Sequence, residues 1–238
     1  MKLDPAKVSL LALQMYLEGY ELSDVVKNAS HKRRLKTIYR HYHALLTWHA
    51  YFQENKPTEF KGEKEFQIFL LYLSECVSDI CQAIFLWSHG LYKPCNLILR
   101  SSIENFFRSI GLQEGQAILE IESTFELARV IRATNIVQGS PVARAQFDRL
   151  WSAYGELCKY VHTADRSHMS LTTAVGVFPR FDQEEARETS EMMRKCITAN
   201  YGLLCLMFPK YYRKFHHGDY DAVSDVLPKA VRQKLGGR

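Results

Sequence analysis

The sequence lacks the short motifs that mark the common nucleotide-binding and hydrolase folds. Its 238 residues contain no Gly-x-x-x-x-Gly-Lys-Ser/Thr phosphate loop, no Gly-x-Gly-x-x-Gly after a predicted strand and no Gly-x-Ser-x-Gly. These absences leave ATPase, dinucleotide oxidoreductase and α/β-hydrolase hypotheses without support.

Paired cysteines, a signal peptide and a long uncharged apolar run are also missing. None of the six cysteines forms a Cys-x-x-Cys pair, and five lie in apolar helical patterns, which indicates buried free thiols. The N-terminus lacks the layout of a signal peptide. The longest apolar stretch, residues 66–87, contains Glu75 and Asp79, which argue against a membrane span. We expect a cytoplasmic protein without membrane contact, and we predict neither a metal site nor another cofactor.

Helical periodicity dominates what is present. Hydrophobic residues make up 47% of the chain and charged residues 24%, an ordinary globular balance. Apolar residues recur every three or four positions, and the breaks between helices carry Gly, Pro or polar residues. The predicted long helices are residues 23–53, 64–88, 93–112, 116–137, 142–162 and 182–208, with shorter pieces at 209–217 and 220–235.

Short connections between long amphipathic helices predict an all-α fold, an up-and-down antiparallel bundle. We expect a single domain over residues 1–238, with N-terminal helices in 1–63, a central bundle in 64–208 and short C-terminal helices in 209–238. Residues 163–180 form the one long non-helical stretch. Within it, residues 171–178 are β-branched enough to predict a short strand or irregular β-like segment.

Positive charge is concentrated in one predicted helix. The net formal charge is +5, and residues 25–53 carry six lysines and arginines without an acid. Arg33, Lys36 and Arg40 share the face opposite the apolar stripe, and Arg34 lies beside them. One interpretation is a surface that binds nucleic acid. The alternative is a solvated helix face with no partner.

A second pattern is a charge ladder on two consecutive helices. Glu75 and Asp79 lie one turn apart, and Arg100, Glu104 and Arg108 follow beyond the turn near residue 90. Counting outward from that turn predicts Asp79–Arg100 and Glu75–Arg108 ion pairs, because isolated buried charges are costly. The ladder is either a structural network that sets the register of the bundle or the floor of an active site.

The segment after the helix predicted at 142–162 is the third pattern. His162, Arg166 and His168 occur together with Asp165 where helical periodicity ends. Histidine is the natural general acid or base near neutral pH, and arginine suits a phosphate. The alternative is a polar helix cap and loop.

Two of these segments resemble a known family. The segment Asn96-Leu-Ile-Leu-Arg100-Ser-Ser-Ile-Glu104 and, later, Tyr154-Gly-Glu-Leu-Cys-Lys-Tyr-Val-His162 are similar to the paired signature of HEPN-like bacterial helical proteins found near abortive-infection and toxin systems. The resemblance covers roughly residues 64–208. It implies a helical bundle, a homo-oligomer and, in the active members, metal-independent RNA cleavage. Those members carry Arg, four to six residues, then His, a spacing that occurs here at Arg34 and His41, outside this region.

Two functional hypotheses follow. In the first, the protein is a HEPN-like ribonuclease of a defence or toxin system. Arg100 and Arg166 would then hold the phosphate of an RNA, His162 or His168 would move protons, and Glu104 would orient a histidine or arginine. In the second, it is a non-catalytic helical module that binds a partner protein, nucleic acid or a small ligand, and the ladder is structural.

Overall fold

The computed structural model describes residues 5–19, 27–160 and 179–236. All regular elements in these ranges are helices, so the predicted all-α bundle is confirmed. The strand predicted at residues 171–178 lies outside the described residues. The core joins residues from Leu10 to Leu235 in one cluster.

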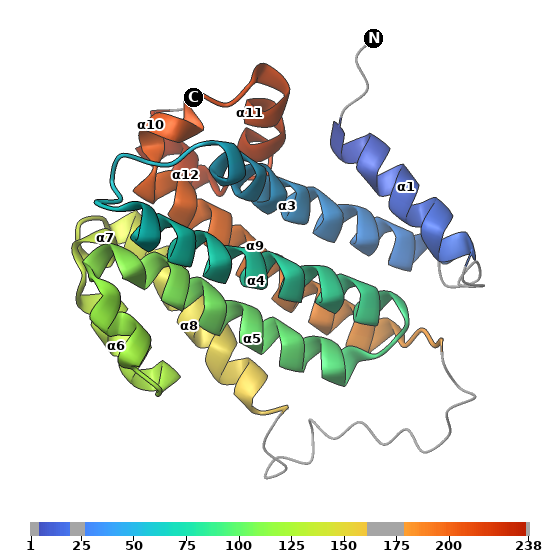
Figure 1. The fold of residues 1–238 in the computed structure, drawn as a ribbon. Coiled ribbons are helices and arrows are strands. Elements are labelled where there is room, and N and C mark those ends of the chain that lie inside the picture. The colour runs from blue at the N-terminus through green and yellow to red at the C-terminus, as the bar shows by residue number, and fades with distance from the viewer. Residues whose placement is uncertain (1–4, 20–26, 161–178, 237–238) are drawn as a thin grey trace.

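Five long helices build the bundle (Figure 1). They are α3 (Ala29–Glu54), α4 (Glu63–Ser88), α5 (Tyr92–Gly111), α8 (Pro141–Cys158) and α9 (Gln183–Met207). The shorter elements are α1 (Pro5–Gly19), two 3-10 helices η1 (Leu112–Glu114) and η2 (Gln116–Glu120), α6 (Thr124–Ala133), α7 (Asn135–Gln138), α10 (Pro209–Tyr212), α11 (His217–Ser224) and α12 (Lys229–Lys234).

Side-chain caps explain where several helices begin. Asn28 accepts hydrogen bonds from the first turn of α3, and Asp182 does the same for α9. The single helix predicted at residues 116–137 is wrong. Ser123 caps a new helix at α6, and the extended backbone of Thr134 separates α6 from α7. Local capping therefore overrides the continuous apolar pattern.

The long helices alternate in direction along the chain, so the first and the fifth of them, α3 and α9, run parallel where they pack together. Their contacts advance in steps of seven residues along both helices, from Arg34–Glu191 through His41–Thr198 to Trp48–Cys205. The two helices therefore begin at the same end of the bundle.

Helix α9 forms the centre of the molecule. Every residue from 196 to 205 is buried, so the second half of the helix has no solvent face. It packs against α3, α4, α5 and α8. A helix buried all round must be apolar or have its polar groups satisfied. Tyr201 donates to the carbonyl of Val226 at 2.7 Å, and its hydroxyl lies 2.8 Å from Nδ1 of His41.

Two histidines are part of this interior. His31 is fully buried and stacks on Trp87, with ring centroids 4.1 Å apart. Neither of its ring nitrogens has a hydrogen-bond partner in the described part of the chain. Burial lowers the pKa of His31 to about 4. Burial, together with Arg194 and Arg40, lowers the pKa of His41 to about 4 as well.

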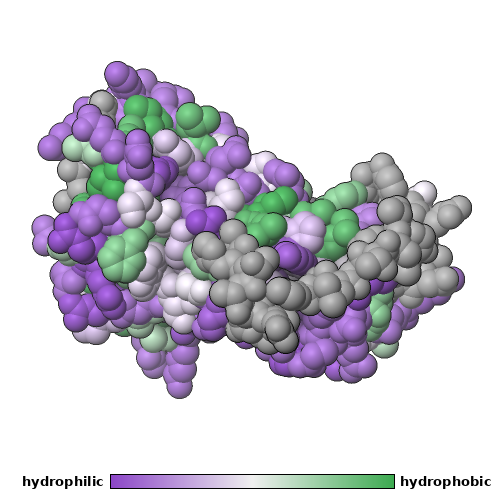
Figure 2. All heavy atoms as spheres, turned by 90° about the horizontal axis from the view of Figure 1, so that it is seen from below, coloured by the Kyte–Doolittle hydropathy of each residue, from purple (hydrophilic) through white to green (hydrophobic). Residues whose placement is uncertain are grey.

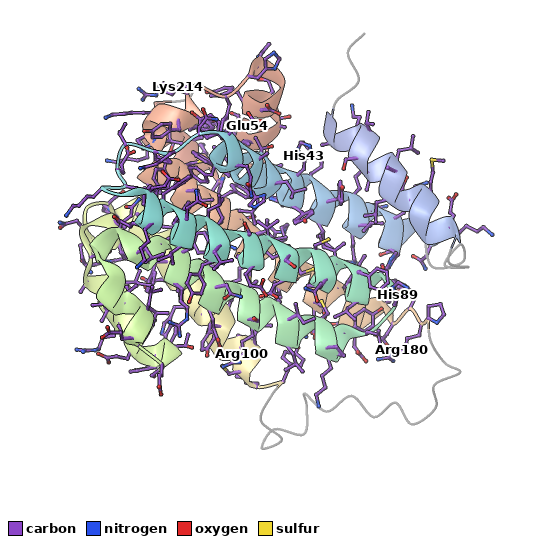
Figure 3. All side chains as sticks on the ribbon, viewed as in Figure 1. His43, Glu54, His89, Arg100, Arg180 and Lys214 are labelled. Carbon is purple, nitrogen blue, oxygen red and sulfur yellow. The ribbon has the colours of Figure 1, made fainter. Side chains whose placement is uncertain are left out.

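The turn between α4 and α5 depends on a glycine. Gly90 has φ +74°, a conformation that L side chains rarely adopt. Arg180 donates its backbone N–H to the carbonyl of His89 at 3.3 Å, and a Cβ on Gly90 would overlap the carbonyl oxygen of Arg180. Glycine therefore lets the segment before α9 lie directly on this turn. Figure 3 shows His89 and Arg180 together at this end of the bundle.

Helix α4 is the one helix in the described ranges that is long and apolar enough to cross a membrane by length and composition. Half of its most apolar window is buried inside the protein. Its buried face packs on α3, α5 and α9. These contacts account for its composition without a membrane.

The buried histidines predict acid sensitivity. Between pH 6.5 and about 4, His31 and His41 are protonated in the unfolded chain but remain neutral in the folded chain. The free energy of unfolding should therefore fall as the pH is lowered through this window, by about 3 kcal/mol for each imidazole. Urea unfolding at several pH values measures it. His31→Phe, which keeps the stack on Trp87, should flatten the slope. The exposed His216→Gln should leave it unchanged, and equal slopes for all three proteins would contradict this assignment.

Candidate functional site

Three polar side chains from α5 and α8 meet at one point. Nη2 of Arg100 lies 2.8 Å from Oε1 of Glu104, and it donates to the hydroxyl of Tyr154 at 2.7 Å. That hydroxyl in turn donates to the same Glu104 oxygen at 2.9 Å. We call these three residues the polar triangle. Figure 3 shows Arg100 on the part of α5 that passes the C-terminal end of α8.

The polar triangle is partly open to solvent. The side chains of Arg100 and Glu104 are 31% and 28% exposed. Nε of Arg100 lies 3.4 Å from Sγ of Cys158, and its guanidinium lies over the ring of Tyr154, 5.0 Å from the centroid. Burial raises the pKa of Tyr154, and the Glu104 carboxylate raises it further, so the phenol keeps its proton at neutral pH. Trp151 stacks on the other side of the Tyr154 ring and holds it in place.

The two ion pairs predicted between α4 and α5 are wrong. All four residues are described, and neither Asp79 and Arg100 nor Glu75 and Arg108 have a carboxylate oxygen and a guanidinium nitrogen within 4.0 Å of each other. Asp79 instead accepts a hydrogen bond from Asn105 at 3.0 Å. The count from the turn predicted correctly which part of α5 lies opposite Asp79. It did not predict which residues of that part face α4. Arg100 points towards α8, whereas Asn105, about 100° further round the helix from Glu104, points towards α4.

The other members of the ladder have separate surroundings. Arg108 donates to the carbonyl oxygen of Ile121 at 3.0 Å and so holds the end of η2 against α5. Glu75 is exposed on α4. Desolvation raises the pKa of Asp79, and hydrogen bonds from Ser101 and Asn105 oppose that rise. The residues of the predicted ladder therefore do not form one network. Arg100 and Glu104 contact α8, whereas Asp79 contacts Asn105 on another face of α5.

Three of the predicted catalytic residues, His162, Arg166 and His168, lie outside the described residues. Helix α8 ends at Cys158, four positions before His162 along the chain. Tyr154, which was not among the predicted site residues, is the new member of the site. It lies in the segment of the sequence that carries the family resemblance, eight positions before His162, and it could have been recognised there as a polar residue.

The predicted basic face divides into two parts. Arg33 and Arg34 line a groove between α3 and α9 with a volume of about 280 Å³, whose other lining residues include Thr37, Ser190, Glu191 and Arg194. We call it the basic groove. Arg40 lies outside it, 3.7 Å from Asp225 of the α11 end. Lys36 is exposed on the outer side of α3. Arg194 was missed because it lies in a helix with both signs of charge.

A larger cavity of about 630 Å³ opens between α1, α3, α4 and α5, and we call it the apolar pocket. None of the described residues that line it is charged. Its described lining is Leu13, Tyr39, Tyr42, Leu46, Cys81, Gln82, Ile84, Phe85, Leu86, Ser88 and Ile98. Figure 2 shows one face of the molecule, on which hydrophobic residues form separate areas among hydrophilic ones.

The fold and these sites define an all-α bundle protein with a polar cluster between two helices and a basic groove between two others. Comparison of the chain with family models, with curated proteins and with solved structures finds no match. Within the described ranges, no group of three or more His, Cys, Asp or Glu side chains could hold a metal ion.

The environment of Asp79 predicts a stabilising substitution. Because its folded pKa is raised, the folded chain binds the carboxyl proton more tightly than the unfolded chain does, and stability is lost as the pH rises above the unfolded value. Asp79→Asn removes this cost and can still accept from Asn105. It should raise the free energy of unfolding at pH 7, and the gain should shrink towards pH 4. Urea unfolding of both proteins measures this. A loss of stability at pH 7 would mean that Asp79 has a cationic partner after all.

Proposed function

We propose that this protein is a HEPN-like ribonuclease that cleaves RNA without a metal ion. The observation that carries the proposal is the polar triangle: an arginine, a carboxylate and a phenol from two helices meet, partly exposed, in the two segments that carry the family resemblance. Buried or half-buried ion pairs seldom stabilise a fold more than apolar residues would. The presence of such a pair at the contact between two amphipathic helices therefore favours a chemical role.

Each residue of the triangle has a part in the proposed reaction. The 2′-oxygen of the RNA attacks the adjacent phosphorus, and the bond from phosphorus to the 5′-oxygen breaks. His162 takes the 2′-hydroxyl proton as general base. Tyr154, whose raised pKa keeps it protonated, turns its hydroxyl away from Glu104 and gives the proton to the departing 5′-oxygen. The products are a 2′,3′-cyclic phosphate and a 5′-hydroxyl.

The charged members of the triangle prepare this site. Arg100 stabilises the negative charge that grows on the phosphate oxygens in the transition state. Glu104 accepts from both Arg100 and Tyr154 and so holds the two side chains next to each other. Arg166 and His168 follow His162 closely in sequence and remain candidates for phosphate binding and proton transfer.

The family resemblance supplies the biological setting of the proposal. On that basis we propose that the protein belongs to a bacterial defence or toxin system in the cytoplasm and acts as a homo-oligomer or with a partner protein of that system. The chemistry itself requires only a ribose 2′-hydroxyl, so the same sequence in DNA should not be cut.

The experiment uses the purified full chain, EDTA, and end-labelled RNA and DNA of one sequence. We expect RNA cleavage by the wild type and a loss of about 100-fold or more for His162→Ala and for Tyr154→Phe, the range typical of general acid–base residues. The thermal transition should move by only a few degrees. His216→Ala and Tyr72→Phe, on an exposed loop and on α4, are the matched controls.

Two results would contradict the ribonuclease proposal. One is a wild-type protein that leaves both RNA and DNA intact. The other is cleavage that the His162 and Tyr154 variants retain at the level of their controls, which would indicate a contaminating nuclease. A large loss of stability in His162→Ala, in a protein without activity, would assign that residue a structural role.

The apolar pocket favours a second candidate function, a non-catalytic module that binds a neutral hydrophobic ligand. Its volume lies in the range of small-molecule sites, and its uncharged lining excludes a requirement for an ionic group. An uncharged solvatochromic dye should bind with one-to-one stoichiometry to the wild type. Ile98→Gln should abolish this binding, whereas Leu97→Gln on the exposed side of the same turn should preserve it. Equal dye binding by the two variants would remove this candidate.

A further inference from the structure

We infer that the basic groove between α3 and α9 binds a phosphoryl group of a polynucleotide. The inference rests on the proposed function for the choice of RNA as the ligand, but its geometry is independent of the polar triangle. Three guanidinium groups, those of Arg33, Arg34 and Arg194, converge from two helices on a space of about 280 Å³. That space is large enough for a phosphate and its attached sugar.

The cations of the groove are poorly compensated by the protein. Glu191 is the single acid among the described lining residues, and it lies 3.8 Å from Arg34. Its carboxylate is closer to Arg187, at 3.2 Å, so its charge is already shared with a cation outside the groove. Within the described chain, Arg33 and Arg194 have no ion-pair partner. The arginines repel one another, and an anion between them would relieve that repulsion.

Arg34 provides a second, independent observation. Its Nε is buried and has no hydrogen-bond partner in the described part of the chain. A buried guanidinium N–H without an acceptor is costly, and a phosphate in the groove would stabilise the same guanidinium through the part of the side chain that is exposed, 24% of it. Arginine is suited to this role because its planar group donates two parallel hydrogen bonds to phosphate.

The position of the groove along α3 adds to the attraction. Ser30, Arg33 and Arg34 lie in the first two turns of this 26-residue helix, where the helix dipole favours negative charge. The residues of α3 from 29 to 53 include no acid.

The surrounding charges give the bound strand a direction. The first turns of α9 carry Glu184 and Glu188, which form ion pairs with Arg187 and would repel a polyanion at that end. On α3, Lys36 lies beyond the groove towards the opposite end, and Arg40 follows it, 3.7 Å from Asp225. A polynucleotide held by one phosphoryl group in the groove would therefore extend along α3 towards Lys36.

The test measures binding alone, with a 2′-O-methyl RNA that cannot undergo the proposed cleavage. Fluorescence anisotropy compares the full-length wild type, Arg33→Ala with Arg194→Ala, and the control Arg129→Ala with Arg144→Ala. The control removes two exposed arginines from α6 and α8. We expect about tenfold or weaker binding for the groove variant and a smaller dependence on salt, because about two phosphate contacts are lost. The control variant should bind like the wild type.

Two further arms identify the source of the phosphoryl group. If removal of the 5′-phosphate weakens binding to the wild type but not to the groove variant, the groove holds a terminal phosphate. If it changes neither, while the groove variant still binds more weakly, the groove holds a backbone phosphodiester. Competition by inorganic phosphate against the wild type alone would support the terminal phosphate.

Two outcomes would overturn the inference: equal binding by the groove variant and the wild type across the salt series, or equal weakening by the groove and control variants. Failure of the cleavage proposal is separate from either, since a wild type that binds RNA through the groove but does not cut it would leave the phosphoryl site intact. Conversely, if the groove variant cleaves RNA and binds it like the wild type, only the inference about the basic groove is contradicted, and the cleavage proposal stands.

Discussion

Complete burial of the second half of α9 is the constraint on which the other features of the bundle depend. A helix without a solvent face needs neighbours on every side, and α3, α4, α5 and α8 supply them. With alternating directions, five helices leave α3 and α9 parallel. Their N-terminal halves then lie side by side, which brings the arginines of α3 against Arg194 of α9. The basic groove is thus a consequence of how the central helix is surrounded.

Helix α5 carries polar groups on two of its faces, and each face has a different neighbour. Towards α8 it presents Arg100 and Glu104, which Tyr154 joins. Towards α4 it presents Asn105, which binds Asp79. The first group is partly exposed and rich in donors, whereas the second contains a carboxyl whose pKa is raised by desolvation. Only the first has the exposure that a substrate requires.

The arginines of the two sites differ in the groups that contact their guanidinium groups. Arg100 is held by a carboxylate, a phenol and a thiol, so its guanidinium is fixed and can act on a charge that develops beside it. Among the described arginines of the basic groove, Arg34 alone has a carboxylate within 4 Å, that of Glu191 at 3.8 Å. They are suited to capture an anion that arrives already charged. In the proposed functions, Arg100 would therefore serve RNA cleavage, and the arginines of the basic groove would serve RNA binding.

Periodicity, caps and breakers determined the helices, because these signals act within a few residues of one another. The all-α class and the long helices of the bundle follow from them, and so does the level at which Asp79 meets α5. Tertiary structure decided which face each polar residue presents and which helices become neighbours. That is why Asp79 met Asn105 in place of Arg100, why Tyr154 joined the polar triangle, and why Arg194 completed a groove that α3 alone does not form. Such contacts depend on the rotation of each helix about its axis and on the packing of α3, α4, α5 and α8 against α9, and no local pattern encodes either.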